Sequence, residues 1–158
     1  VSYKIYGGEE EAFDDIGAPD GTTFLVKNLF YTIGDVERIG DHAENLAELA
    51  QINIKNNREF SESGLNDLKK ISEAAVKSVE SAMECRESKE LSKVRQTARY
   101  EEEVDNMEEE LKELHMERLS NHECNTKSGV IFLDAVSNYE RIADHARNIA
   151  GYVKEEIE

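Results

Sequence analysis

The sequence is poor in the residues that interrupt helices or cross-link small folds. Its 158 residues include one proline, nine glycines and two cysteines, and tryptophan is absent. Cys85 and Cys124 lie far apart and form no CxxC motif, so the sequence predicts neither a disulfide framework nor a zinc knuckle. A reducing, cytoplasmic location fits this cysteine usage best.

Long apolar runs are also missing. No stretch approaches the roughly 18 consecutive apolar residues of a membrane-spanning helix. The N-terminus lacks the basic stretch followed by an apolar one that marks a secretion signal. We therefore expect no direct insertion into a membrane. Because the first residue is Val1, we also expect the chain to be a piece of a longer protein.

Positive charge is scarce relative to negative charge. The chain has 35 acidic residues against 19 lysines and arginines, which gives a formal net charge of −16. The resulting field repels phosphate backbones and anionic lipid head groups, and it attracts cations. Nucleic acids and acidic membrane surfaces are therefore excluded as expected partners.

What the sequence has in quantity is helix-forming residues with a helical period. Residues 1–27 hold four of the nine glycines and the only proline, so we expect an irregular lead-in there. Apolar residues then recur at three- and four-residue steps in four stretches, which predicts four long amphipathic helices. They begin near Asn28, after an N-cap at Ser61 or Ser63, near residues 88–90, and near Ser128. Joined by short polar loops, they predict one antiparallel all-α bundle over residues 28–158.

Two of the predicted helices carry almost the same eleven residues. "ERIGDHAENLA" occupies residues 37–47 and "ERIADHARNIA" occupies residues 140–150, 103 positions later. This spacing is too long for a solenoid repeat and is typical of a duplicated unit of several helices. Each copy places a glutamate and an aspartate four residues apart, on one helix face.

These carboxylate pairs allow two interpretations. Like charges four residues apart destabilise a helix by about 0.2–0.5 kcal/mol, and a nearby cation reverses that effect. The cation could be Arg38 or Arg141, each three residues before the motif aspartate, on an exposed face. It could instead be a metal ion, because paired carboxylates on neighbouring helices are suitable hard oxygen ligands.

The third predicted helix offers another such pair. In "YEEEVDNMEEELKELH", Glu101 and Asp105 lie four apart and close to the inward apolar stripe, although Glu102 and Asn106 allow a second register. On the last predicted helix, Glu140 and Asp144 lie on a flank of the apolar stripe. Only a second contact face of that helix would bury these two carboxylates. If the two pairs face each other, four carboxylates share a small volume, where they cannot all stay ionised without metal or protons.

The same residues carry a family resemblance. "DVERIGDHAENLAELA" and "NYERIADHARNIAGYV", with "YEEEVDNMEEELKELHMERL" between them, resemble helices of the PhoU family of phosphate-uptake regulators. The first segment is especially similar to the PhoU-like domain of bacterial sodium/phosphate cotransporters. The resemblance implies two repeated three-helix units and clusters of iron, zinc or related metal ions held by an (E/D)xxxD pattern. It also implies restraint of phosphate import through contact with a phosphate transporter or its membrane domain and, in some members, with a sensor kinase.

Carried onto this chain, the pattern implies metal ligands at Glu101, Asp105, Glu140, Asp144, Glu37 and Asp41. Residues 28–57 correspond to the last helix of the first repeat, and residues 63–157 to a complete second repeat, so the first repeat is truncated. The first-repeat pair therefore lacks an intrachain partner pair. Its site is weaker, empty, or completed by a second subunit of a homo-oligomer, and the second-repeat pairs form the favoured site.

Catalysis is not predicted. None of the four histidines has a glutamate three residues before it, as carboxylate-bridged di-iron bundles require, and phosphate-loop, GxSxG and cysteine–base motifs are absent. His42 and His145, next to the motif aspartates, are expected to be interfacial or solvated rather than ligands. The alternative function is a non-catalytic helical interaction or structural bundle that binds no metal.

Overall fold

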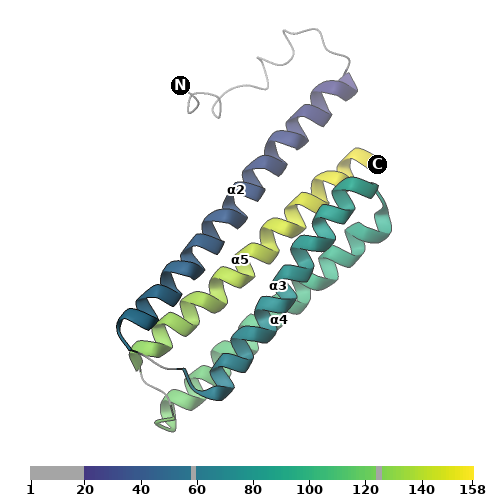
Figure 1. Ribbon diagram of the computed structural model, residues 1–158. Helices are drawn as coiled ribbons and strands as arrows, with labels where there is room; N and C mark the ends of the chain where they lie inside the picture. The colour runs from purple at the N-terminus through teal and green to yellow at the C-terminus, as the bar shows by residue number, and fades with distance from the viewer. Residues whose placement is uncertain (1–19, 58–59, 124–125) are drawn as a thin grey trace.

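The chain folds into long helices. The structure is a computed structural model that describes residues 20–57, 60–123 and 126–158 (Figure 1). Its helices are α2 (Asp20–Lys55), α3 (Glu62–Ser88), α4 (Leu91–Ser120) and α5 (Thr126–Ile157). The described part of the chain contains no strand, and the predicted all-α antiparallel bundle is confirmed.

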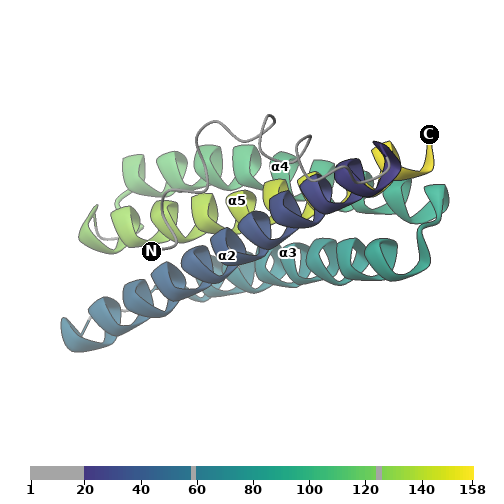
Figure 2. The ribbon, with the colours of Figure 1, turned by 90° about the horizontal axis from the view of Figure 1, so that it is seen from above.

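The helices are arranged as a three-helix unit with one additional helix. α3, α4 and α5 pack against one another, and α5 also contacts α2 along its length. α2 runs antiparallel to α5, so the start of α2 lies near the C-terminal end of α5 (Figures 1 and 2). Within the described residues, the second repeat is therefore complete, and the first is represented by α2.

The hydrophobic core lies inside the three-helix unit. Ile71 of α3, Val104 of α4, and Phe132 and Val136 of α5 are almost completely buried in one cluster. Burial of each such side chain stabilises the fold by about 1.5–3 kcal/mol relative to exposure. On α5, Ala143, Ala146 and Ala150 are also buried. Their small side chains let α3 and α4 approach α5 closely along most of its length.

The first helix starts earlier than the sequence predicts. Residues 20–27 were expected to belong to the irregular lead-in, but α2 begins at Asp20. Gly21, Thr22 and Thr23 are weak helix formers, so their local preference is overridden by the helix that follows. Buried Asn28 anchors that helix by donating a hydrogen bond to the Tyr152 carbonyl at 3.2 Å. The rest of the predicted lead-in, residues 1–19, lies outside the described residues.

The other helix boundaries follow local capping chemistry. Ser61 is the N-cap of α3, and its hydroxyl accepts a hydrogen bond from the Gly64 backbone N–H at 3.1 Å. This geometry selects Ser61 over Ser63 as the predicted cap. α3 ends before Lys89, which adopts the left-handed conformation with a φ of 54° and donates its backbone N–H to the Cys85 carbonyl.

The two sequence repeats meet each other across the α2·α5 interface. Asp35 accepts hydrogen bonds from His145 at 2.6 Å and Asn148 at 3.2 Å. The equivalent of Asp35 in the second copy is Asn138, and its side-chain oxygen accepts from His42 at 2.9 Å and from Asn45 at 3.3 Å.

The rings of His42 and His145 stack between these two networks, with centroids 5.7 Å apart. Because equivalent residues exchange equivalent contacts, an approximate twofold axis passes between the two histidines. Both histidines are interfacial, as the sequence predicts, and Asn45 and Asn148 hydrogen-bond between the helices.

Candidate metal site

The carboxylates of α4 and α5 converge. One oxygen each from Glu101, Asp105 and Asp144 can be chosen so that the three atoms lie within 4.8 Å of one another. Glu101 is buried, and the two aspartates are half-buried. The sequence allowed two carboxylate registers on α4. The register with Glu101 and Asp105 is therefore the one that faces the repeat motif on α5.

Packing of apolar neighbours fixes this arrangement. Val104 is fully buried in the core, so Glu101 and Asp105 on either side of it in sequence are turned toward α5. On α5, buried Ile142 and Ala143 place the motif carboxylates at the edge of the same interface. Burial of these carboxylates required a second contact face on α5, beside its apolar stripe. α4 packs against that face.

Crowding of negative charge shifts the pKa values upward. Burial, then the nearby Asp144, raises the pKa of Glu140 to about 7, although Arg141 opposes the shift. Burial, then the charges of Glu101 and Asp144, also raises the pKa of Asp105. Glu140 lies outside the group of three, but its pKa responds to Asp105 and Asp144, so the four carboxylates interact electrostatically.

One buried oxygen in this cluster has no hydrogen-bond partner. Asp105 Oδ1 is shielded from solvent and accepts no hydrogen bond from the described residues. An unpaired buried carboxylate oxygen is costly, because it has lost water without gaining a donor. A cation among the three carboxylates would satisfy it.

Two arginines partly neutralise the cluster. Arg147 Nη1 contacts both oxygens of Glu101, at 2.6 and 2.7 Å. Arg141 lies 3.4 Å from both Glu140 and Asp144, as the ion-pair interpretation of the motif predicted. The two guanidinium groups would leave a formal charge of −2 if all four carboxylates were ionised, so the arginines alone do not neutralise the cluster.

Arg147 is the site residue that sequence reasoning missed. It stands seven residues after Glu140, and therefore on the same face of α5, which was the available signal. Its pairing with Glu101 depends on how α4 and α5 are placed side by side. A helical period alone does not give that placement.

The first-repeat pair is not part of a cluster. Glu37 and Asp41 are exposed on α2, and among the described residues they join no group of three possible metal ligands. Arg38 is also exposed and, within the described residues, forms no ion pair with Asp41. Within the residues that the structure describes, no second carboxylate pair faces this one.

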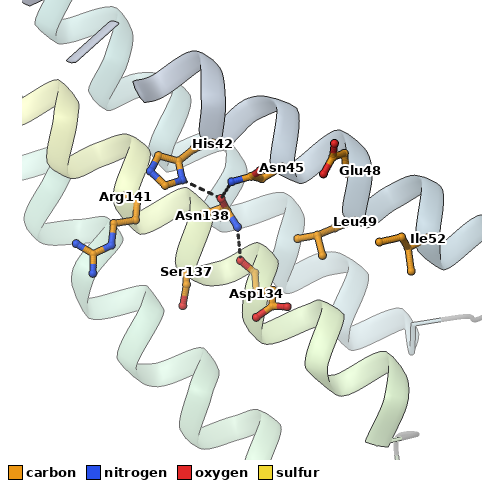
Figure 3. Close-up of a pocket in the computed structure, with 9 residues that line it drawn as sticks. All are labelled: His42, Asn45, Glu48, Leu49, Ile52, Asp134, Ser137, Asn138 and Arg141. Atoms are coloured by element: carbon orange, nitrogen blue, oxygen red, sulfur yellow. Dashed lines mark hydrogen bonds between the residues drawn. The ribbon is translucent and has the colours of Figure 1, made fainter. Parts of the chain in front are cut away.

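A groove of about 390 Å³ lies between α2 and α5 (Figure 3). Its lining includes the hydrogen-bonded set of His42, Asn45 and Asn138, and Asn138 also donates to the Asp134 carbonyl at 2.8 Å. Arg141 forms part of the wall and connects the groove to the carboxylate cluster. The central polar groups of the groove therefore hydrogen-bond to one another and join α2 to α5.

Comparison with known proteins identifies the family. The family model for the PhoU domain matches residues 68–153, which is more than half of the chain. This chain belongs to the PhoU domain family. The match begins within α3 and ends at Val153, before the end of α5, and it contains Glu101, Asp105, Glu140 and Asp144. Membership of the PhoU family indicates a regulatory role in phosphate homeostasis.

Other comparisons add little to the PhoU assignment. The DNA mismatch repair protein MutL of Agathobacter rectalis is 58% identical over 31 residues, which are 20% of this chain and 5% of that protein. So short a match does not show a second family. No solved structure matched the chain significantly. None of the helices in the described ranges is long and apolar enough to cross a bilayer.

Proposed function

We propose that this PhoU domain binds a metal ion, iron or zinc, between α4 and α5 and modulates phosphate transport by contact with a transporter. The observation that carries the metal site is the convergence of Glu101, Asp105 and Asp144 within 4.8 Å. Carboxylate oxygens suit hard and borderline cations, and a residual negative charge favours their binding.

The residues have different parts in this proposal. Asp105 and Asp144 supply oxygens directly, and the unpartnered Oδ1 of Asp105 is the first candidate ligand atom. Glu140, whose pKa is raised to about 7, would release its proton if a cation bound beside it. Arg147 holds the carboxylate of Glu101 in position. An ion held by these residues would join α4 to α5 and would stiffen the surface proposed to contact the transporter.

Elemental analysis of the purified protein tests the metal site. The protein is loaded with Zn²⁺ or Fe³⁺, dialysed, and measured beside the Asp105→Asn and Asp41→Asn variants. We expect bound metal in the parent and in Asp41→Asn, and a loss of about tenfold or more in Asp105→Asn. Equal metal contents in the parent and in Asp105→Asn would overturn the proposed site, provided that circular dichroism shows equal helix content.

The partner proposed for this domain is a phosphate transporter at the cytoplasmic face of the membrane. A bacterial sodium/phosphate cotransporter is the first candidate, and a sensor kinase is a further one. The family assignment supports this part of the proposal. Co-expression of the chain with such a cotransporter should lower the initial rate of radiolabelled phosphate uptake. An unchanged rate at equal transporter abundance would contradict the proposed contact.

The arginines favour a second candidate function. Because Arg147 and Arg141 already pair with three of the four carboxylates, the cluster could be a purely structural ion-pair network. The chain would then be a non-catalytic interaction bundle without metal. Elemental analysis separates the two functions, because this alternative requires equally low metal in the parent and both variants.

A further inference from the structure

The groove between α2 and α5 occupies one half of an interface that the repeat makes approximately twofold symmetric (Figure 3). Each lining residue has an equivalent 103 positions away in the other copy of the repeat. In the equivalent half, which we call the aromatic half, the rings of Tyr31 and Tyr152 stack with centroids 5.6 Å apart. The residues equivalent to these tyrosines are Asp134 and Leu49, and both line the groove. The groove therefore lies where the aromatic half holds two rings.

The packing of α5 shows that this part of the interface stays open when a repeat is complete. α5 is packed against both α3 and α4. A Cβ atom added at its Gly151 would nevertheless meet nothing within 4 Å, and Glu155, one turn later, is exposed. The equivalent positions on α2 are Glu48 and Ile52, which line the groove. Helices packed on α2 as α3 and α4 pack on α5 would therefore leave these positions open.

The lining of the groove combines apolar side chains with acids. Leu49 and Ile52 supply the apolar part. Asp134 and Glu48 are exposed and form no ion pair with another described residue. Arg141, also in the lining, lies at the opposite end of the groove from Ile52 and pairs with carboxylates of the candidate metal site (Figure 3). The apolar end of the groove therefore carries negative charge without a described positive partner.

The aromatic half combines its rings with a cation. Lys27 Nζ lies 5.9 Å from the centroid of the Tyr31 ring. The residue equivalent to Lys27 is Val130, so the second copy has neither the tyrosines nor this ammonium group at the equivalent positions. A ligand that contains both an aromatic ring and an ammonium group would supply what the aromatic half obtains from its own side chains.

We propose that the groove binds a small aromatic cation, with its ring against Leu49 and Ile52 and its ammonium group paired with Asp134 or Glu48. The groove volume of about 390 Å³ lies within the usual range of small-molecule sites. Burial of the ring on apolar side chains favours binding, and the two acids favour a positive over a negative ligand. The proposal does not depend on the metal site.

Three small probes test this proposal. Phenethylamine carries a ring and an ammonium group, hydrocinnamate carries the ring with a carboxylate, and butylamine carries the ammonium group without a ring. The full chain is titrated with each probe in metal-free buffer at neutral pH, and amide chemical shifts in NMR spectra give the dissociation constants. We expect phenethylamine to bind about tenfold or more tightly than either other probe, with the largest shifts at residues that line the groove. Added salt should narrow its advantage over hydrocinnamate.

Variants of the chain locate the site. Leu49→Tyr places a phenol ring where the aromatic half has Tyr152, so binding of phenethylamine should fall by about tenfold or more. Leu65→Tyr on α3, at a side chain that is 54% exposed, is the matched control and should bind as the parent does. Asp134→Asn keeps the shape of the groove and should reduce the preference for phenethylamine over hydrocinnamate. Circular dichroism should show equal helix content in all of these variants.

Several results would overturn the proposal. Equal binding of phenethylamine and butylamine would show that the groove does not recognise a ring, and equal binding of hydrocinnamate would show that the acids do not select a cation. Undiminished binding by Leu49→Tyr at equal helix content would place the ligand elsewhere. Chemical shifts centred on Glu101, Asp105 and Asp144 would show that the amine is only a counter-ion of the carboxylate cluster.

Discussion

Among the described side chains, Asp35 accepts the most hydrogen bonds across the α2·α5 interface. Its two oxygens accept hydrogen bonds from His145, Asn148 and the Tyr152 hydroxyl, the last at 2.9 Å. Burial, then the hydrogen bond to Asp35, raises the pKa of Tyr152, which keeps the phenol a donor. A single buried carboxylate therefore holds three side chains of α5 to α2.

Removing that carboxylate should loosen α2. Asp35→Ala leaves three donors without this acceptor, two of them on the partly buried His145 and Tyr152, and we expect a loss of about 2–3 kcal/mol in the free energy of unfolding. Asn138→Ala, at the equivalent position, should cost about 1 kcal/mol, because Asn138 is uncharged, is less buried than Asp35, and holds two side chains of α2 and not three. Urea denaturation measures both. Equal losses in the two variants would contradict the asymmetry of the interface.

Gly129 lacks a side chain at a position where the ring of the buried His115 packs closely against the backbone of α5. A Cβ atom added at Gly129 would lie 2.4 Å from His115 Nε2, whereas nothing lies within 4 Å of one added at Gly151. Gly129→Ala should therefore destabilise the fold by about 1–3 kcal/mol. Gly151→Ala, in the same helix, should stabilise it by about 0.5–1 kcal/mol. Thermal unfolding of the two variants should give shifts of opposite sign, and a stabilised Gly129→Ala variant would contradict the close contact.

His115 should make the fold sensitive to acid. Burial, then the charge of Arg118, lowers the pKa of His115 below its usual 6.5. The unfolded chain therefore binds this proton more readily, so the free energy of unfolding falls as the pH drops through about 6.5. Denaturation at about pH 7.5 and pH 5.5 should show a smaller loss in His115→Gln than in the parent. An equal loss of unfolding free energy in the parent and in His115→Gln would show that His115 is not buried as a neutral group.

At the scale of the helix, local chemistry and tertiary contacts determine different boundaries. The apolar periods predict the four long helices, and the cap residue Ser61 marks the start of α3. Both signals can be recognised in the sequence because each involves residues that are close together in the chain. Local sequence signals did not predict the start of α2. Gly21 and Thr22 disfavour helix locally, and the helix over them is anchored by the contact of Asn28 with α5.

The cap of α3 gives a prediction at this scale. Ser61→Ala removes the side-chain acceptor of the Gly64 N–H and should cost about 1 kcal/mol of stability. Ser63→Ala, two residues away, removes only an exposed hydroxyl contact and should change stability by less than about 0.5 kcal/mol. Chemical denaturation distinguishes them, and a larger cost for Ser63→Ala would place the cap elsewhere.

At the scale of the whole molecule, the repeat relates the carboxylate pairs of α2 and α5, and among the described residues only the α5 pair meets carboxylates of another helix. Sequence reasoning predicted one site made by the pairs on α4 and α5, and the structure brings Glu101, Asp105 and Asp144 together but leaves Glu140 outside this group. It could not predict the pairing of Arg147 with Glu101, which requires the relative placement of two helices. It also could not show that Glu37 and Asp41 stay exposed, since that depends on how α2 is turned against α5.

The central claim is that the acidic side chains of α4 and α5 share one cation. Anomalous diffraction from crystals grown with Zn²⁺ tests it most directly, because the signal locates the ion itself. We predict one strong peak enclosed by the carboxylates of Asp105 and Asp144, with Glu101 beside it. A map without a peak there, with Arg147 and Arg141 still paired to these acids, or with a peak only at Glu37 and Asp41, would contradict the account.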